Sequence, residues 1–403
     1  MKYVLINSWC KKGSTGKIVY NFYKFLCDEG HETFFFHGRD EDQDDNNIIR
    51  ITKNEGNVIH GVKSRLTGLQ GYYSKNETKK LINKIKKIEP DYVYLFNLHG
   101  YYLNEPMLLS YLKESGVKVI YMLFDEYPFL GKCCFSAGCD KYRKQCGECP
   151  QIYEYPKSLI FDKSNQIFNM KKEIYSNWAN LHFAGVKFVQ ERASESILAH
   201  NIPYSTFDMG IDIEKIYYPR DIKNISQKFK INPQKKIVLT VGFSSDSRKG
   251  IDKYIKLAKM LDNTVFLHIG YDKKITKALP SNYIAVNYVS DLEEMSEIYS
   301  LADVYVTCSS GEAMSNACLE ALACGTPIVA FDTSGMSYLA DSPVGRYAKY
   351  GDLVEMKKLI ESSSKKTDEM RKKCRQLAEE RYGLKLFMRN LYNASVLFDE
   401  VSK

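Results

Sequence analysis

Two glutamates with seven residues between them are the first group in this chain that could do chemistry. Glu312 and Glu320 lie in SSGEAMSNACLEALACGTPIVAFD, a segment with the pattern of a strand, a loop and a helix. The AMSNA residues between them would begin the helix, where backbone N–H groups and the helix dipole favour a bound phosphate. Carboxylates on either side can accept hydrogen bonds from sugar or ribose hydroxyls. The same spacing also occurs in proteins without such a site, so it leaves both interpretations open.

A glycine-rich loop follows the first apolar run of the chain, in CKKGSTGKIVY, residues 10–20. A Walker A loop requires a glycine, four residues and then Gly-Lys-Ser/Thr. Here Ile18 follows Gly16-Lys17, and Lys11 stands where the first Walker glycine belongs. The spacing argues against an ATP- or GTP-hydrolysing switch. Lys17 is then expected to be a solvent-facing residue at the start of a helix.

Five of the eleven cysteines lie within GKCCFSAGCDKYRKQCGECP, residues 131–150. An odd total argues against a complete disulfide framework. Cys146 and Cys149 form a Cys-x2-Cys pair that, with Cys133 and Cys139 upstream, could close a tetrahedral structural zinc site. A cluster of reduced thiols or an occasional disulfide is the alternative.

The composition describes an ordinary globular protein. At 403 residues, with 44% hydrophobic and 26% charged residues, the chain is expected to form two domains. No apolar run approaches the ~18 residues of a membrane span, and the start MKYVLINSWC does not resemble a signal peptide, so a cytoplasmic location is expected. The net charge of +8 suits an anionic substrate or membrane surface and is too small to indicate nucleic acid.

The elements that must position these residues alternate between strand and helix. KYVLIN, TFFFHG, DYVYLFNL and VKVIYMLF predict strands of a first unit, and KKIVLTVG, TVFLHIG, DVYVTCS and PIVAFD predict those of a second. Helical patterns separate them, which predicts an α/β protein with two doubly wound, Rossmann-like domains. We place these domains at residues 1–205 and 206–384, with a final helix at 385–403 packing back on the first. The helix ETKKLINKIKKIEP presents either a solvated basic face or a surface for anionic lipid headgroups.

Several motifs occur together in an order that is specific to one family. INSWCKKGSTGKIV, MGID, DSRKGID and the Glu-x7-Glu segment ending in LEALACGTP resemble retaining GT-B glycosyltransferases of family 4. NLHGYYLN and FDEYPFLGKC, with the cysteines after it, resemble a subgroup that builds bacterial capsule, exopolysaccharide and colanic-acid-type polymers. The resemblance covers most of the chain. It implies two domains facing each other across a cleft, a nucleotide-sugar donor and no catalytic cofactor or metal.

The resemblance also implies a role for individual residues. Glu312 would contact hydroxyls of the transferred sugar, and Glu320 would contact the ribose. Lys249, with Arg248 beside it, would neutralise the diphosphate as the sugar–oxygen bond breaks. His99 would line the acceptor pocket as the third catalytic residue. The remaining donor-binding positions would be Gly13, Gly16, Ser244, Ser315, Asn316 and Ala317.

The chain departs from the family pattern at a few positions: Tyr94, Phe96 and Phe124 replace expected histidines, and Phe243 replaces an arginine. Arg248 or Ser244 would take over from that arginine. The missing histidines leave the acceptor and the rate open. They also permit a second interpretation, in which the protein is a catalytically degenerate subunit that only binds the donor.

We expect a transferase that moves a sugar, from a UDP-sugar more readily than a GDP-sugar, to a glycan or lipid-linked saccharide of a bacterial surface polymer. Peripheral contact with the inner leaflet of the cytoplasmic membrane would accompany this activity. A sugar-nucleotide epimerase is a further alternative, but it needs a carboxylate and histidine set for proton abstraction, which the sequence does not identify.

Overall fold

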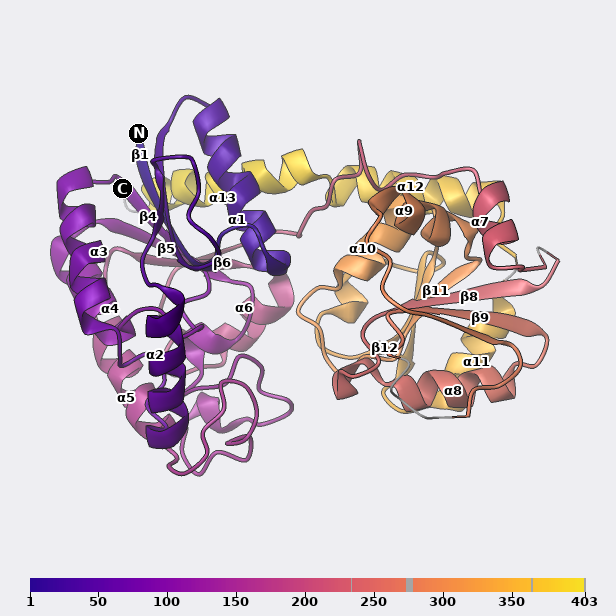
Figure 1. Ribbon diagram of the computed structural model, residues 1–403, viewed down its shortest axis with the longest axis horizontal. Coiled ribbons are helices and arrows are strands. Elements are labelled where there is room, and N and C mark those ends of the chain that lie inside the picture. Colours follow the sequence, from indigo (N-terminus) through magenta and orange to yellow (C-terminus); the bar gives the residue numbers. More distant parts are fainter. Residues whose placement is uncertain (233, 273–277, 364, 402–403) are drawn as a thin grey trace. The chain divides into compact units, whose positions relative to one another are not determined.

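The computed structural model describes residues 1–232, 234–272, 278–363 and 365–401. The chain forms two compact units (Figure 1). The first contains Met1–Phe207 and Met388–Lys403, and the second contains Asp208–Phe387. The last helix, α13 (Leu384–Val401), begins in the second unit and continues in the first. In the part of the chain that the structure describes, no helix has the length and apolar character needed to cross a bilayer.

The first unit is built on a parallel sheet in the order β3-β2-β1-β4-β5-β6-β7. Its strands are β1 (Lys2–Trp9), β2 (Glu32–Arg39), β3 (Ile48–Arg50), β4 (Tyr92–Leu95), β5 (Lys118–Leu123), β6 (Leu181–Gly185) and β7 (Tyr204–Thr206). The central strands β1, β4 and β5 are buried along almost their whole length, as their continuous apolar runs require.

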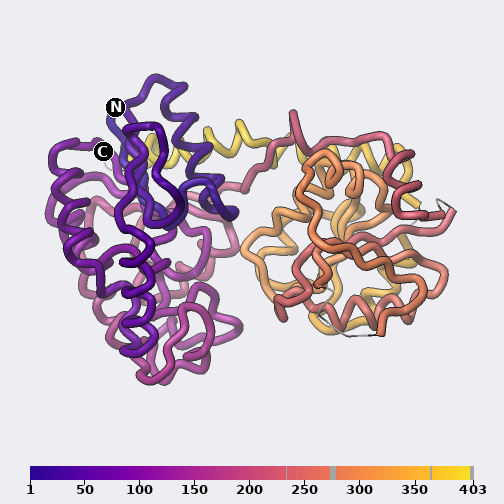
Figure 2. The backbone as a smooth tube through the Cα atoms, viewed as in Figure 1, coloured from indigo at the N-terminus to yellow at the C-terminus, as the bar shows by residue number. Residues whose placement is uncertain are grey.

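Helices connect these strands: α1 (Gly13–Asp28), α2 (Asn54–Thr67), α3 (Lys75–Ile88), α4 (Glu105–Ser115), α5 (Ser164–Tyr175) and α6 (Lys187–Ser194). Between β5 and α5 the chain runs through a long, mostly irregular segment with two short 3-10 turns, η1 (Tyr127–Phe129) and η2 (Lys141–Arg143), which is traced in Figure 2. Helix α13 is tied to this unit by side chains of the sheet. The Tyr94 hydroxyl donates to the Leu391 carbonyl at 2.9 Å, and Asp399 accepts from Tyr92 and pairs with Lys118, each at 2.5 Å.

The second unit repeats the plan with a parallel sheet in the order β10-β9-β8-β11-β12-β13. Its strands are β8 (Lys236–Val241), β9 (Thr264–Ile269), β10 (Tyr283–Val286), β11 (Val304–Thr307), β12 (Ile328–Asp332) and β13 (Gly345–Lys349). Its helices are α7 (Lys223–Lys228), α8 (Ile251–Met260), α9 (Leu292–Leu301), α10 (Asn316–Ala323), α11 (Leu353–Ser362) and α12 (Asp368–Arg381), with 3-10 turns η3 (Ser247–Lys249) and η4 (Met336–Tyr338).

Each sheet has one point at which the strand order changes direction, and such points are where open α/β sheets bind ligands. In the first unit it lies between β1 and β4, and in the second between β8 and β11. The segments that follow the carboxyl ends of these four strands contain Gly13, His99, Lys249 and Glu312. The topology therefore gathers the residues singled out in the sequence at the ligand-binding edge of each sheet.

The sequence prediction of two parallel, Rossmann-like α/β domains is confirmed. One local prediction is wrong. Helix α1 begins at Gly13, so Lys17 lies in its second turn and is not the first helical residue. It is exposed, as expected. The glycine stretch is thus the first turn of α1, because a three-residue connection from β1 ends at Gly13, which has a φ of +70°.

Candidate functional site

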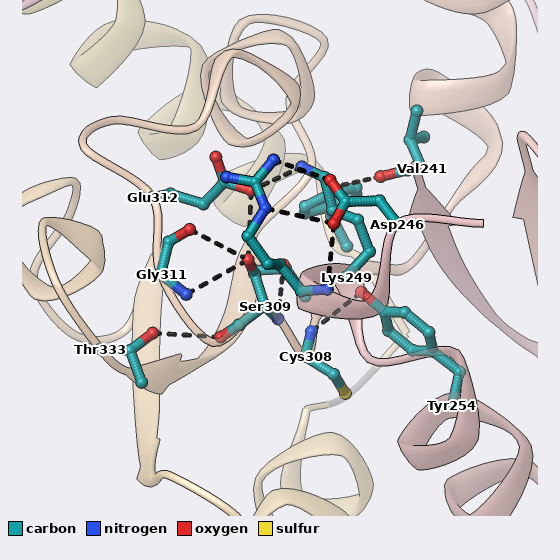
Figure 3. Close-up of polar contacts among 12 residues, drawn as sticks. Val241, Asp246, Lys249, Tyr254, Cys308, Ser309, Gly311, Glu312 and Thr333 are labelled. Carbon is teal, nitrogen blue, oxygen red and sulfur yellow. Dashed lines mark hydrogen bonds and ion pairs between the residues drawn. The ribbon is translucent and has the colours of Figure 1, made fainter. Parts of the chain in front are cut away.

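The ion pair between Lys249 and Glu312 is the centre of the candidate site in the second unit. The Lys249 Nζ lies 2.5 Å from the Glu312 Oε1, although 63 positions separate the two residues. Their side chains are 29% and 21% exposed, so a ligand can reach the pair. The Ser309 hydroxyl donates to the same carboxylate oxygen at 3.1 Å (Figure 3). The structure thus brings together two of the three predicted catalytic residues.

Tight backbone packing sets the position of Lys249. Gly250 has a φ of +73°, and a Cβ there would lie 2.6 Å from the carbonyl oxygen of Cys308 at the end of β11. A larger residue would push α8 away from this strand. The stem of Lys249 crosses Gly242, where a Cβ would lie 3.2 Å from the Lys249 Cδ. The Ser310 N–H donates to the Arg248 carbonyl at 2.9 Å, which joins the lysine loop to the glutamate loop.

Arg248 and Ser244 have structural partners of their own. The Arg248 guanidinium pairs with Asp246, with its terminal nitrogen 2.8 Å from the Asp246 Oδ2. This pairing, with several hydrogen bonds to Asp246, lowers the pKa of that carboxyl against the opposing effect of burial. Ser244 is buried, and its hydroxyl accepts from the Asp272 N–H at 2.7 Å. Arg248 and Ser244 thus shape the loops after β8 and β9, and their predicted contacts with a donor stay predictions.

Glu320 lies in the second turn of α10, as the sequence predicted for an early helical position. Its Oε2 accepts from the Tyr299 hydroxyl at 2.6 Å. Burial and the charge of Glu320 raise the pKa of Tyr299, so this phenol stays protonated and donates. Ser315 is the N-cap residue of α10 and makes no side-chain cap, and Asn316 and Ala317 form its first turn. The N–H groups at this helix end suit an anion.

Sequence reasoning missed an aromatic pair beside these loops. Phe243, noted only as a replacement for arginine, stacks on Tyr288 with the ring centroids 6.1 Å apart and an angle of 17° between the planes. The two side chains are among the most exposed large apolar groups of the chain. Exposed, parallel aromatic faces are suited to stacking on a nucleobase. The available signal was the position of Phe243 two residues after the end of the central strand β8.

The candidate site of the first unit is a cavity of about 400 Å³ next to the glycine turn. Gly13 and Gly16 line it, together with Ser8, Trp9, Lys12, Ser14, Thr15, Arg39, Arg65, Asn97, His99, Gly100, Tyr101 and Tyr155. No heavy atom lies within 4 Å of the Cβ position of Gly13, so its backbone is open to a ligand. At Gly16 a Cβ would lie 3.1 Å from the Cβ of Trp9, so this glycine serves mainly to let α1 pack against β1.

His99 is held in this cavity by a carboxylate that the sequence analysis did not assign. Its Nε2 lies 2.8 Å from the Asp125 Oδ2, and its Nδ1 lies 3.1 Å from the Tyr155 hydroxyl. Burial opposes the charged ring, but nearby negative charge and the hydrogen bond with Asp125 raise the pKa of His99 well above its usual value. Burial raises the pKa of the neighbouring Cys134 thiol. The contact with Asp125 orients the His99 ring and favours its charged form.

The cysteine segment partly matches the predicted zinc site. Cys133 and Cys149 have their Sγ atoms 3.9 Å apart, close to the separation of about 3.8 Å that two thiolates have on one tetrahedral zinc. A hydrogen bond from Cys133 lowers the pKa of Cys149 to about 6. A cavity of about 20 Å³ is lined by all four predicted ligands, which include Cys139 and Cys146.

The Sγ atoms of the four predicted ligands do not all lie as close to one another as the ligands of one zinc ion do. In the described ranges, one group brings three potential ligand atoms within 4.8 Å of one another, and it consists of His99, Asp125 and Cys134. This group includes none of the four predicted zinc ligands. Zinc at the four cysteines stays a prediction.

Comparison with known proteins gives these two sites a context. Residues 221–381 match the family described as Glycosyl transferases group 1. The second unit contains a group 1 glycosyltransferase domain. Lys249, Glu312 and Glu320 all lie within it.

Two curated relatives and one solved structure extend this result. The chain is 29% identical over 177 residues to an alpha-galactosylglucosyldiacylglycerol synthase of Streptococcus pneumoniae, covering 38% of this chain and 46% of the relative. It is 30% identical over 148 residues to a processive diacylglycerol alpha-glucosyltransferase of Acholeplasma laidlawii, covering 34% and 44%. The chain thus spans less than half the length of these relatives.

The structure is similar to that of HepE from Anabaena in complex with UDP, with a TM-score of 0.67, 14% identity and coverage of 98% of this chain and 100% of that one. The fold is GT-B, with one Rossmann-like domain in each unit. This confirms the fold that the motifs of the sequence implied.

Proposed function

We propose that this protein is a retaining glycosyltransferase that moves a sugar from a nucleotide-sugar donor to a glycan acceptor carried by a lipid. The observation that carries the proposal is the ion pair of Lys249 and Glu312 within the group 1 domain. It places a cation, which can pair with a diphosphate, beside a carboxylate, which can accept hydrogen bonds from sugar hydroxyls, at the switch point of the second sheet.

Donor binding would exchange the partners of this pair. The diphosphate is a stronger anionic partner for Lys249 than a single carboxylate, and it would also meet the N–H groups at the start of α10. Glu312 would then be released to accept hydrogen bonds from the sugar hydroxyls. Fixed positive charge at Lys249 would stabilise the negative charge that develops on the departing diphosphate. The retaining outcome rests on the family resemblance of the Glu-x7-Glu segment.

A uridine donor is our preferred choice. The solved structure of HepE contains UDP, and the stacked pair of Phe243 and Tyr288 offers an aromatic face beside the same loops. The lipid character of the acceptor follows the names of the two curated relatives, both of which act in diacylglycerol glycolipid synthesis. A role at the bacterial surface, and contact with the cytoplasmic face of the membrane, belong to this same proposal.

A second candidate function is a subunit that binds the donor without transferring the sugar. The observation that favours it is the contact between the two phenylalanines that replace expected histidines. Phe96 stacks on Phe124 with the ring centroids 5.9 Å apart, and Phe96 is buried. An apolar aromatic pair therefore occupies two positions where histidines were expected.

A panel of UDP-, GDP-, ADP- and dTDP-sugars, scored by thermal shift and by donor hydrolysis, tests both candidates. We expect one UDP-sugar to stabilise the protein and to be hydrolysed slowly, and Glu312→Ala and Lys249→Ala to weaken both responses. If no sugar nucleotide stabilises the wild-type protein, the assignment is wrong. Binding without turnover on any lipid-linked acceptor would favour the binding subunit.

A further inference from the structure

Helix α2 has its polar and apolar faces reversed relative to an ordinary surface helix. Its buried positions include Asn57, His60 and Ser64, whose side chains make hydrogen bonds inside the unit. Its large apolar side chains point outward instead: Val58, Ile59, Val62 and Leu66 are 64%, 55%, 48% and 45% exposed. A helix that turns its apolar residues to solvent is not stabilised by doing so, and such patches mark interaction surfaces.

A neighbouring loop extends this surface. Leu159, Ile160 and Phe161 are each about half exposed. The Leu159 N–H donates to the Arg65 carbonyl at 2.7 Å, and a Cβ on Gly68 would lie 2.1 Å from the Phe161 carbonyl oxygen. The loop therefore packs directly against the end of α2. We call the combined surface the α2 face; it consists of Val58, Ile59, Val62, Leu66, Leu159, Ile160 and Phe161.

The α2 face adjoins a cavity with excess positive charge. A cavity of about 470 Å³ is lined by Val58 and Val62 of α2. It shares Trp9, Lys12, Arg39, Arg65 and Tyr101 with the cavity beside the glycine turn. Apolar side chains and a polar site thus meet along one helix, so a single ligand with an apolar part and a charged part can use both.

Two arginines in this cavity are available for an anion. Arg39 donates from its Nε to the Gly100 carbonyl at 2.9 Å and lies over the rings of Trp9 and Tyr101. Arg65 also lies near the Tyr101 ring. Among the described residues, neither guanidinium forms an ion pair with a carboxylate, while Lys12 is paired with Asp40 at 3.0 Å. The planar guanidinium matches the oxygens of a phosphate.

Tyr101 supplies a second, independent observation at the same place. Its backbone has a φ of +66°, an uncommon conformation for a bulky residue. Tyr101 is 6% exposed, and its hydroxyl makes no hydrogen bond of standard geometry in the described residues, although the nearby Arg65 opposes the rise in its pKa that burial causes. A buried hydroxyl without a partner is costly unless a ligand satisfies it. His99 lines the adjoining cavity, where its Nε2 lies 2.8 Å from the Asp125 Oδ2.

We propose that the α2 face docks on an anionic lipid bilayer and that Arg39, Arg65 and Tyr101 bind the phosphate of a lipid-linked acceptor. The inference rests on the proposed transferase function and names its acceptor class as a lipid phosphate. The apolar chain of this lipid would run along Val58 and Val62, and its phosphate would reach Arg39 and Arg65. A soluble partner protein would use only the apolar side chains, and a free sugar phosphate would use only the cations.

Charge around the α2 face agrees with a bilayer as the occupant. Lys53, Lys63, Arg65 and Lys157 are exposed on the same segments, against the exposed carboxylates of Glu55 and Glu154. Helix α3, which the sequence suggested for this role, buries Leu81, Ile82 and Ile85 and exposes mainly lysines. It can add attraction to anionic headgroups but offers no apolar side chains for insertion.

Vesicle co-sedimentation with the full chain tests the docking surface. Ile59 and Leu66 belong to the α2 face but do not line either cavity, so Ile59→Ser with Leu66→Ser should leave donor hydrolysis unchanged. We expect this variant to lower binding to phosphatidylcholine–phosphatidylglycerol vesicles by about tenfold or more. Val396→Ser with Leu397→Ser is the matched control, because both side chains are similarly exposed on α13 and should not matter.

A second set of vesicles tests the phosphate site. Adding a polyprenyl phosphate to phosphatidylcholine vesicles should increase binding of the wild type, and Arg65→Ala should abolish that increase while Arg65→Lys restores part of it. Equal wild-type binding to all vesicles, or an Ile59/Leu66 variant that binds normally, would overturn the proposal. So would a wild-type dimer that this variant converts to a monomer, because the α2 face would then be a protein interface. Failure of every nucleotide sugar to bind, with vesicle binding intact, would refute only the transferase function.

Discussion

Replacing Lys249 with methionine should impair donor chemistry while leaving the fold intact. Methionine keeps an unbranched stem to pack over Gly242, where the Lys249 side chain lies 3.2 Å from a Cβ position. It removes a charge-assisted contact with the diphosphate, and such contacts contribute about 1.5–3 kcal/mol. At about 1.4 kcal/mol for each factor of ten, this corresponds to a loss of roughly 10- to 150-fold in kcat/KM.

The expected cost in stability is much smaller. The ion pair with Glu312 is partly exposed, and pairs of this kind contribute about 1 kcal/mol or less. Glu312 also keeps its hydrogen bond from the Ser309 hydroxyl at 3.1 Å. We therefore expect Tm to fall by no more than about 4 °C in a unit of this size.

Kinetics of UDP-sugar hydrolysis and thermal shift with UDP measure the two effects separately. Lys256→Met on the exposed side of α8 is the matched control and should change neither quantity. Because Lys249 and Glu312 touch, the double variant with Glu312→Gln should lose less activity than the two single losses combined. A Lys249→Met protein that keeps wild-type kcat/KM, or one that loses activity only because it unfolds, would refute the assigned role of this lysine.

Three further changes test other parts of the two sites. Phe243→Ala should weaken UDP binding by roughly 5- to 150-fold, the worth of one aromatic–base stack, and an unchanged Kd by calorimetry would exclude stacking. Asp125→Asn should lower the pKa of His99. The pKa of His99 is raised in the folded protein. The stability that the His99–Asp125 pair contributes is therefore fully present below pH 6.5, and it is lost as the pH rises through the pKa of His99 in the folded protein. The Tm difference from wild type should thus be largest in acid and shrink in base, and a pH-independent difference would contradict it. Metal analysis should find one zinc in the wild type and in Cys27→Ser but none in Cys146→Ser, whereas a zinc-free wild type would rule the site out.

The fold and part of the site could be predicted because their signals are local in the sequence. Apolar runs such as KYVLIN and TVFLHIG specify buried parallel strands, and the helical spacing between them specifies the doubly wound plan. Glu312 was identified from the Glu-x7-Glu pattern after a predicted strand, and Lys249 from the resemblance of DSRKGID to a family segment. The start of α1 was misplaced because the turn at Gly13 allows the helix to begin within the glycine stretch.

The contacts that give the motifs their chemistry depend on strand order, which no local pattern contains. Lys249 meets Glu312 because β8 and β11 are neighbours in the sheet, although α8, β9, β10 and α9 separate them in the sequence. The outward apolar face of α2 has helical spacing in the sequence, but spacing alone does not reveal which face is buried. Here Asn57 and His60 lie on the buried face because they make hydrogen bonds with polar partners, the Gly38 carbonyl and the Ser74 hydroxyl. The sequence of α2 specifies the helical spacing of its apolar residues. Only tertiary packing decides which face of the helix is exposed to solvent.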